Sequence, residues 1–147
     1  MCYTFIAMSE TASKLYKCSI RIEDLAHDQT IYEGVARLNR LKNSWSVVFF
    51  DHKERERWTI EPDRLSIDNG SDHGLRMRFE RGKDKALSGM AFPPNPVGII
   101  EVPLQVNRLI LSKDHALVRY SVEPHHEIFE LGLQILNESP VEPKKKN

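Results

Sequence analysis

Leu75-Arg76-Met77-Arg78-Phe79-Glu80 is the clearest amphipathic stretch in this sequence of 147 residues. Its apolar and charged side chains alternate, so an extended backbone places the apolar ones on one face and the charged ones on the other. The turn signal Asn69-Gly70 precedes the stretch, and Arg81-Gly82-Lys83-Asp84 follows it. The stretch therefore predicts an antiparallel β-strand with one buried face and one solvated face.

Similar runs continue along most of the chain, and none carries a helical stripe. They are short, rich in β-branched and aromatic residues, and separated by turn residues. Their ranges are 15–22, 30–38, 45–50, 57–61, 65–67, 75–80, 86–92, 100–106, 109–111, 117–123 and 127–136. Strands joined in this order would leave exposed edges in an open sheet, whereas closure removes them. We therefore expect an all-β fold, an antiparallel up-and-down barrel of about 8–10 strands.

Local features refine this expectation. Gly34 lies inside a strand pattern and predicts a bulge or a tight bend. Residues 45–50 are almost continuously apolar, which predicts the most buried strand, covered on both faces. Pro103 cannot donate a ladder hydrogen bond and is expected at an unpaired edge or a bulge. The last two strands flank Pro124-His125-His126 and are expected to form a long hairpin.

The strand pattern assigns residues 13–138 to one barrel domain, and a chain of this length buries enough surface for one real core. Residues 1–12 are expected to be a flexible segment, and residues 139–147, with their lysine cluster, a disordered basic tail. Met8 opens a polar stretch, so translation starting there instead of at Met1 is a hypothesis. Intact-mass analysis that finds Met1 retained would contradict it.

Charge and cysteine content narrow the function classes. Lys plus Arg and Asp plus Glu both number 21, so no global field draws the chain to nucleic acid or to an anionic membrane. Cys2 and Cys18 do not form the framework of a secreted disulfide-rich domain. The first residues show neither a cationic signal region nor a cleavage pattern. We therefore expect a cytoplasmic protein, monomeric or homodimeric, without nucleic-acid or membrane partners.

Phe92 to Leu111, FPPNPVGIIEVPLQVNRLIL, combines a proline-bearing bend, a glycine and alternating strands. With Tyr32-Glu33-Gly34 upstream and the tyrosine-centred strand Val118-Arg119-Tyr120-Ser121-Val122 downstream, this arrangement resembles the YwiB-like family of small bacterial proteins. The resemblance spans about Lys14 to Leu136. It implies a calycin-like barrel, related in shape to lipocalins and fatty-acid-binding proteins, and no known activity or catalytic residues. The bend here reads Pro-Pro-Asn-Pro-Val-Gly and departs from the family's aromatic-Thr-Pro-aromatic-Gly form.

No catalytic or cofactor motif is found. The chain contains no G-x-G-x-x-G after a strand, no P-loop and no G-x-S-x-G. Cys18 alternates with apolar residues and is expected in the core. Metal binding by His125, His126 and Glu127 is not expected, because neighbours in an extended segment face opposite sides and no Cys or His pair elsewhere supplies zinc spacing. The charged loop with Asp51, His52, Glu54 and Glu56 is expected to be a solvated hairpin tip, although it offers acid/base groups. We expect no enzyme, no metal and no cofactor.

If the barrel binds a ligand in its interior, the sequence can be searched for a pair of residues that would hold a carboxylate group. Fatty-acid-binding proteins hold a carboxylate with an inward Arg-x-Tyr pair, whereas Arg119 and Tyr120 are adjacent here. They must therefore face opposite sides of a strand, with Tyr120 in the core, so this carboxylate clamp is missing and binding of an acidic lipid in the interior is disfavoured. Arg76 and Arg78 are likewise expected on the exterior, opposite Met77 and Phe79.

The leading hypothesis is a non-catalytic barrel that binds a small apolar or amphipathic ligand in its interior. The residues expected to line that interior are Tyr16, Ile20, Trp58, Met77, Phe79, Leu104 and Tyr120. The alternative is a filled barrel that acts through an exterior surface, such as residues 45–50 in a homodimer. An enzyme would depend on the loops that carry His52 and His125-His126.

Overall fold

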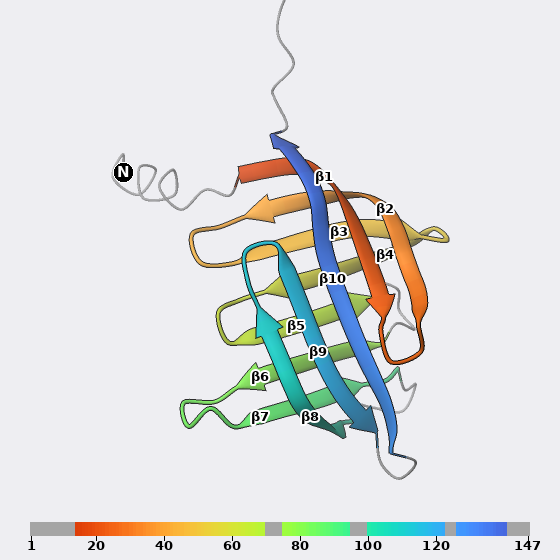
Figure 1. Cartoon of the computed structure of the whole chain (residues 1–147), viewed down its shortest axis with the longest axis vertical. Helices are drawn as coiled ribbons and strands as arrows, with labels where there is room; N and C mark the ends of the chain where they lie inside the picture. Colours follow the sequence, from red (N-terminus) through yellow and green to blue (C-terminus); the bar gives the residue numbers. More distant parts are fainter. Residues whose placement is uncertain (1–13, 70–74, 95–99, 123–125, 141–147) are drawn as a thin grey trace, which may run out of the picture.

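The computed structural model describes residues 14–69, 75–94, 100–122 and 126–140. Its strands are β1 (Lys14–Asp24), β2 (Gln29–Arg40), β3 (Trp45–Asp51), β4 (Glu54–Ile60), β5 (Arg64–Asn69), β6 (Arg76–Arg81), β7 (Leu87–Phe92), β8 (Val102–Leu111), β9 (His115–Val122) and β10 (Glu127–Pro140). Each strand pairs antiparallel with its neighbours in sequence, and β10 pairs with β1 (Figure 1). The predicted antiparallel up-and-down barrel is confirmed.

Alternation along the strands separates the core from the exterior. In β6, Met77 and Phe79 are buried while Arg76 and Arg78 are exposed, as the quoted stretch predicts. The prediction was wrong for Leu75, which precedes β6 and is 42% exposed. The inward residues of all ten strands join in one hydrophobic cluster, whose fully buried members include Ile20, Leu38, Leu65, Phe79 and Leu133.

Three bulges shift the alternation between strands. The extra, unpaired residue is Ile31 in the β1–β2 ladder, Leu136 in the β1–β10 ladder and Asn107 in the β8–β9 ladder. Of the bulge or tight bend predicted at Gly34, the bulge is not found there, because Gly34 pairs regularly with Ile20. The bulge at Asn107 joins residues 100–106 and 109–111 of the sequence pattern into the single strand β8, since an extra residue restores the inward phase.

Strand β3 differs from its prediction. Trp45, Val47 and Phe49 are buried, but Ser46 and Val48 are half-buried and Phe50 is 63% exposed. The expectation of a strand covered on both faces was therefore wrong. Its outward residues face an open groove in the barrel wall, and no other layer of the described chain covers them.

Partner strands determine the end of β10 and the start of the β8–β9 ladder. Strand β10 continues to Pro140, past the predicted end at residue 136, because its last residues pair with Tyr16 and Lys17 of β1. The prediction of a disordered tail was therefore wrong for Ser139 and Pro140, and residues 141–147 lie outside the described residues. Pro103 lies opposite Met90 of β7, while the pairing of β8 with β9 begins one residue later at Leu104. Pro103 therefore faces β9 at a position without a ladder pair, which fits a residue that lacks an N–H.

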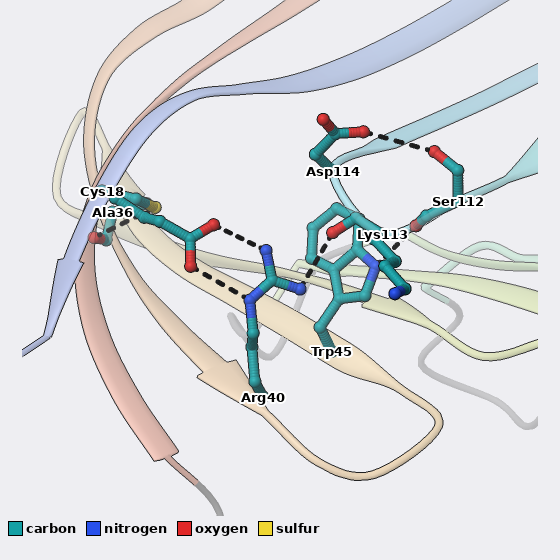
Figure 2. A network of polar contacts seen from close by, with 8 residues as sticks. Cys18, Ala36, Arg40, Trp45, Ser112, Lys113 and Asp114 are labelled. Atoms are coloured by element: carbon teal, nitrogen blue, oxygen red, sulfur yellow. Dashed lines mark hydrogen bonds and ion pairs between the residues drawn. The ribbon is translucent and has the colours of Figure 1, made fainter.

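A polar network secures one end of the β2–β3 pair (Figure 2). The Arg40 guanidinium contacts both carboxylate oxygens of Glu138 in β10, at 2.6 and 3.1 Å, and donates to the Lys113 carbonyl at 2.9 Å. Trp45 donates its indole N–H to the Ser112 carbonyl at 2.7 Å. Strands β2 and β3 are thereby tied to the β8–β9 turn and to β10 at this end of the barrel.

Candidate ligand-binding site

The seven residues predicted to line the interior lie together in the structure. Six of them are buried in the core cluster, and Tyr16 is half-buried against it. Within the cluster, the Phe79 and Tyr120 rings lie 5.2 Å apart and the Tyr120 and Phe129 rings 5.4 Å apart. Burial raises the pKa of Tyr120 to about 12. The predicted inward face is confirmed, and contact of these residues with a ligand stays a prediction.

A cavity of about 900 Å³ lies in the wall where β2 and β3 separate, and Tyr16 is the one residue of the seven that lines it. The β2–β3 ladder covers only Arg37–Arg40 and Trp45–Val48, so β2 continues from Gln29 to Ala36 paired with β1 alone. We call this cavity the wall groove. It is lined by Leu15, Tyr16, Lys17, Tyr32, Val35, Ala36, Arg37, Asn39, Ser46, Val48, Phe49, Phe50, Arg55 and Arg57. Its volume is in the range of small-molecule sites.

The outer part of the wall groove exposes apolar surface. Leu15, Val35 and Phe50 are 47%, 61% and 63% exposed, and all three line the groove. Val48 lies beside them, half-buried, on the outward face of β3. Apolar side chains gathered in a concave surface differ from the single exposed apolar residues that occur on any protein, and they indicate a binding surface.

Four cations surround this apolar surface. The strand registers place Lys17 opposite Arg37, Arg37 opposite Val48, and Val48 opposite Arg57, so these residues form one outward row across four strands. Arg55 stands opposite Phe50 in the next outward row of β3 and β4. None of the described residues that line the groove carries a carboxylate. The groove is therefore amphipathic and positively charged.

The cations of the wall groove have no ion-pair partner among the described residues. Arg57 lies opposite Asp68 of β5, but the two groups do not form an ion pair. Lys17 and Arg37 lie directly opposite each other, and like charges at such positions are destabilising. By contrast, Arg21 and Glu33, on the same two strands, form an ion pair at 3.2 Å. Asp68 continues the row beyond Arg57, so the uncompensated repulsion lies between Lys17 and Arg37, where an anion would relieve it.

Aromatic residues close the inner side of the groove. Tyr32 and Phe49 stack with ring centroids 4.3 Å apart and an interplanar angle of 30°. The Tyr32 hydroxyl donates to the Val35 carbonyl at 2.7 Å. Both rings face inward, so the groove reaches from the exterior of the wall to the edge of the core.

The predicted charged loop contains a titrating carboxyl group. Glu56 accepts a hydrogen bond from Asn69 at 2.6 Å, and the same amide lies 3.2 Å from Glu54. Burial, together with the negative charges of Asp51, Glu54 and Asp68, raises the pKa of Glu56 to about 7. His52 is almost fully exposed in the β3–β4 turn, 3.5 Å from Asp51. The loop therefore holds a half-buried acidic cluster beside Phe49, not only a solvated tip.

The other titratable candidates have structural contacts. Asp24 is buried, accepts the backbone N–H groups of Ala26 and Glu130, and lies 2.7 Å from His27. Asp24 therefore fixes the turn between β1 and β2. Cys18 is 2% exposed, and burial raises the pKa of its thiol to about 11, so its core assignment is confirmed.

Two further predictions concern positions along the strands. Arg119 faces away from the core, 3.6 Å from Glu130, so it and Tyr120 face opposite sides as predicted. His125 lies outside the described residues. Within the part of the chain that the structure describes, no group of three or more His, Cys, Asp or Glu side chains is arranged to hold a metal ion. The same part contains no helix long and apolar enough to cross a membrane.

The wall groove was not predicted from the sequence, although Tyr16, one of the residues predicted to contact a ligand, lines it. Arg37, Arg55 and Arg57 alternate with core residues and resemble ordinary solvated positions within their own strands. The sequence feature that could have indicated the groove is Phe50. It is an outward apolar residue at the end of residues 45–50, the run that was predicted to be covered on both faces. Only the register of four strands shows that this run and the cations share one surface.

The comparisons with known proteins give a likeness of fold. No family model matches the sequence, and no curated protein matches it. Among solved structures, the chain is similar to the crystal structure of the YwiB protein from Bacillus subtilis, with a TM-score of 0.55 and 13% sequence identity. The match covers 90% of this chain and 96% of that chain. The resemblance to the YwiB-like family is thereby confirmed for the barrel fold.

Proposed function

We propose that this protein is a non-catalytic binding protein for a small amphipathic anion, which it holds in the wall groove. The observation that carries the proposal is the combination, in one concave site, of exposed apolar side chains with four cations that lack ion-pair partners. Such a site matches a molecule with a hydrocarbon part and an anionic group. The lipocalin-like shape implied by the family resemblance agrees with a ligand-binding role.

The groove is favoured over the barrel interior as the place of binding. The interior residues named above pack against one another, including the aromatic series through Phe79 and Tyr120. A ligand inside that cluster would have to displace buried side chains, which make many contacts in a close-packed core. The groove needs no such displacement for its outer part, because Val35 and Phe50 are already exposed.

The positions of two arginines indicate which head group the ligand carries. Arg37 and Arg57 flank Val48 from the two neighbouring strands, so an anion above Val48 is within reach of two guanidinium groups. Guanidinium groups bind carboxylates and phosphates with paired hydrogen bonds. The hydrocarbon part would lie on Val35 and Phe50.

Isothermal titration calorimetry with dodecanoate, dodecyl phosphate and dodecyltrimethylammonium tests the proposal. The two anions should bind and the cation should not, and the relative affinity of the anions distinguishes a carboxylate from a phosphate head group. The double variant Arg37→Gln/Arg57→Gln should lose about tenfold or more in affinity for the anions. Equal binding of the cationic amphiphile, or no binding of either anion, would overturn the proposal.

A matched double variant controls for general charge loss. Arg76 and Arg108 are exposed arginines that do not line the groove, so Arg76→Gln/Arg108→Gln removes the same charge elsewhere. Its affinity should stay within about twofold of the original. Light scattering on the same samples separates the alternative, in which Phe50 belongs to a homodimer surface. A stable dimer that Phe50→Arg dissociates would favour that alternative.

A further inference from the structure

The wall groove extends past the free edge of β2 to residues that face inward. Its lining includes outward residues of β2, such as Val35 and Arg37, and inward residues of the same strand, Tyr32 and Ala36. A cavity lined by both faces of one strand must pass the edge of that strand. The edge is the segment Gln29 to Ala36, beyond the end of the β2–β3 ladder.

Tyr32 fills this passage. Its ring is half-buried and is held by the stack on Phe49 and by the hydroxyl hydrogen bond to the Val35 carbonyl. Both contacts come from a side chain, so they can be released without breaking a ladder between strands. Rotation of a tyrosine side chain about its first torsion exchanges one staggered position for another.

The residues beneath Tyr32 are small. A Cβ atom added at Gly34 would lie 2.9 Å from the Tyr32 hydroxyl oxygen and 3.1 Å from the adjacent ring carbon. Glycine at this position therefore makes room for the phenol ring. Ala36 follows on the same face, and the Cys18 thiol lies 3.5 Å from the Ala36 carbonyl. Without the ring, Gly34, Ala36 and Phe49 would border an apolar slot that leads toward Cys18.

We infer that Tyr32 is a gate, and that the hydrocarbon chain of the bound anion enters the barrel wall between β2 and β3 in its place. This inference rests on the proposed function and adds a second subsite to it. The anionic head group stays on the outer row of Lys17, Arg37 and Arg57. The chain replaces the Tyr32 ring against Gly34, Ala36 and Phe49, so that apolar surface remains covered in both states.

The chemical labelling rate of Cys18 measures whether the gate is open, and the measurement requires no ligand. In a Cys2→Ser background, Cys18 is the single cysteine, and its burial at 2% exposure protects it from the uncharged reagent N-ethylmaleimide. Tyr32→Ala removes the gate, and Gly34→Ala forces the ring from its place. Both variants should raise the rate of Cys18 labelling by about tenfold or more, under conditions where the protein stays folded. An unchanged rate in both variants would overturn the gate.

Phe129→Ala is the matched control for general loosening. Phe129 is also half-buried, and it stacks on Tyr120 at 5.4 Å, away from the groove lining. Its truncation should leave the Cys18 labelling rate within about twofold, because it removes an aromatic ring without opening the β2–β3 passage. An increase equal to that of Tyr32→Ala would show that any lost ring exposes Cys18, and would overturn the assignment of Tyr32.

Chain length tests the second subsite and separates it from the proposed function. Dodecanoate should bind about tenfold or more tightly than hexanoate, and saturating dodecanoate should slow the labelling of Cys18 in Gly34→Ala. Equal affinities for both acids, with no effect on labelling, would overturn the passage while leaving anion binding in the groove intact. Absence of binding by both dodecanoate and dodecyl phosphate would overturn the proposed function, whereas the labelling of the ligand-free variants would still decide the gate.

Discussion

Two strand pairs of the barrel wall have short ladders, β7–β8 with three residue pairs and β2–β3 with four, and the wall groove lies at the second. From β6 through β10 to β1, which we call the closed wall, inward residues pack tightly: a Cβ added at Gly89 would lie 2.7 Å from Val106 and 3.0 Å from Phe79. Between β2 and β3, which we call the split wall, the ladder stops after Arg37 and Val48. There the nearest obstacle to a Cβ at Gly34 is the far end of the movable Tyr32 side chain.

The two parts of the wall differ in what they contribute: the closed wall contributes to stability, and the split wall carries the proposed binding site. The closed wall contributes Phe79, at 0% exposure, to the core, and Leu38 and Val47 of the β2–β3 ladder are buried as completely. The split wall has unpaired cations, exposed apolar residues and a half-buried acid, each of which costs stability or contributes none. Features of this kind are concentrated where a protein binds other molecules.

The largest contrast should be between two phenylalanines. Phe79→Ala leaves a cavity in the closed wall and should lower the free energy of unfolding by about 3–5 kcal/mol. Phe50→Ala, at 63% exposure on the split wall, should change it by about 0.5 kcal/mol or less and weaken dodecanoate binding. Urea unfolding, followed by the fluorescence of Trp45 and Trp58, measures both. A large loss for Phe50→Ala would place that side chain in a core or an interface.

Two glycines provide the next contrast. Gly89→Ala pushes a methyl group against Val106 and Phe79, which are fixed by the core, and should cost about 1–3 kcal/mol. Gly34→Ala meets only the end of Tyr32, which can turn outward, and should cost about 1 kcal/mol or less. Urea midpoints of the two variants test this order. The reverse order would mean that Tyr32 is fixed as firmly as the core.

The strands could be predicted from the sequence because their signal is local. Met77 and Phe79 alternate with charged neighbours, and burial of one face follows from that alternation alone. The bulge at Asn107 was not predictable in the same way, because a bulge depends on the partner strand. In the sequence, this bulge is visible only as a break in the alternation between the apolar runs 100–106 and 109–111.

The wall groove could not be predicted because its residues meet only through strand register. Lys17, Arg37 and Arg57 belong to three strands, and a shift of one residue in any ladder would turn a side chain to the other face. The apolar run at residues 45–50 indicated unusual surroundings but not an open groove. Where β2 leaves β3 depends on the closure of the whole barrel, which no single segment encodes.

The acid beside the split wall should make stability depend on pH. The folded pKa of Glu56, about 7, lies above its ordinary value of 4.5, so the folded state retains a proton that the unfolded state releases between these values. Stability should therefore fall as the pH rises from about 4.5 to about 7, and this contribution should then stay constant. Urea midpoints at several pH values should show this slope in the original protein.

Two variants isolate the contribution of Glu56. Glu56→Gln should remove this part of the slope and be more stable than the original above about pH 7. Glu54→Gln, an exposed neighbour in the same cluster, should retain most of it, since burial of Glu56 is the largest cause of the raised pKa. An unchanged slope in Glu56→Gln would assign the effect to other groups.

The smallest effect should come from the charge pairs of β1 and β2. Arg37→Gln removes the repulsion with Lys17 and should raise stability by about 0.5 kcal/mol or less in low salt. Arg21→Gln breaks an attractive pair with Glu33 on the same strands and should act in the opposite direction. Both effects should shrink as salt is added, because both pairs are exposed. If Arg37→Gln instead lowers stability, the Arg37 side chain interacts favourably with another group of the protein. Its charge would then already be compensated without a bound anion.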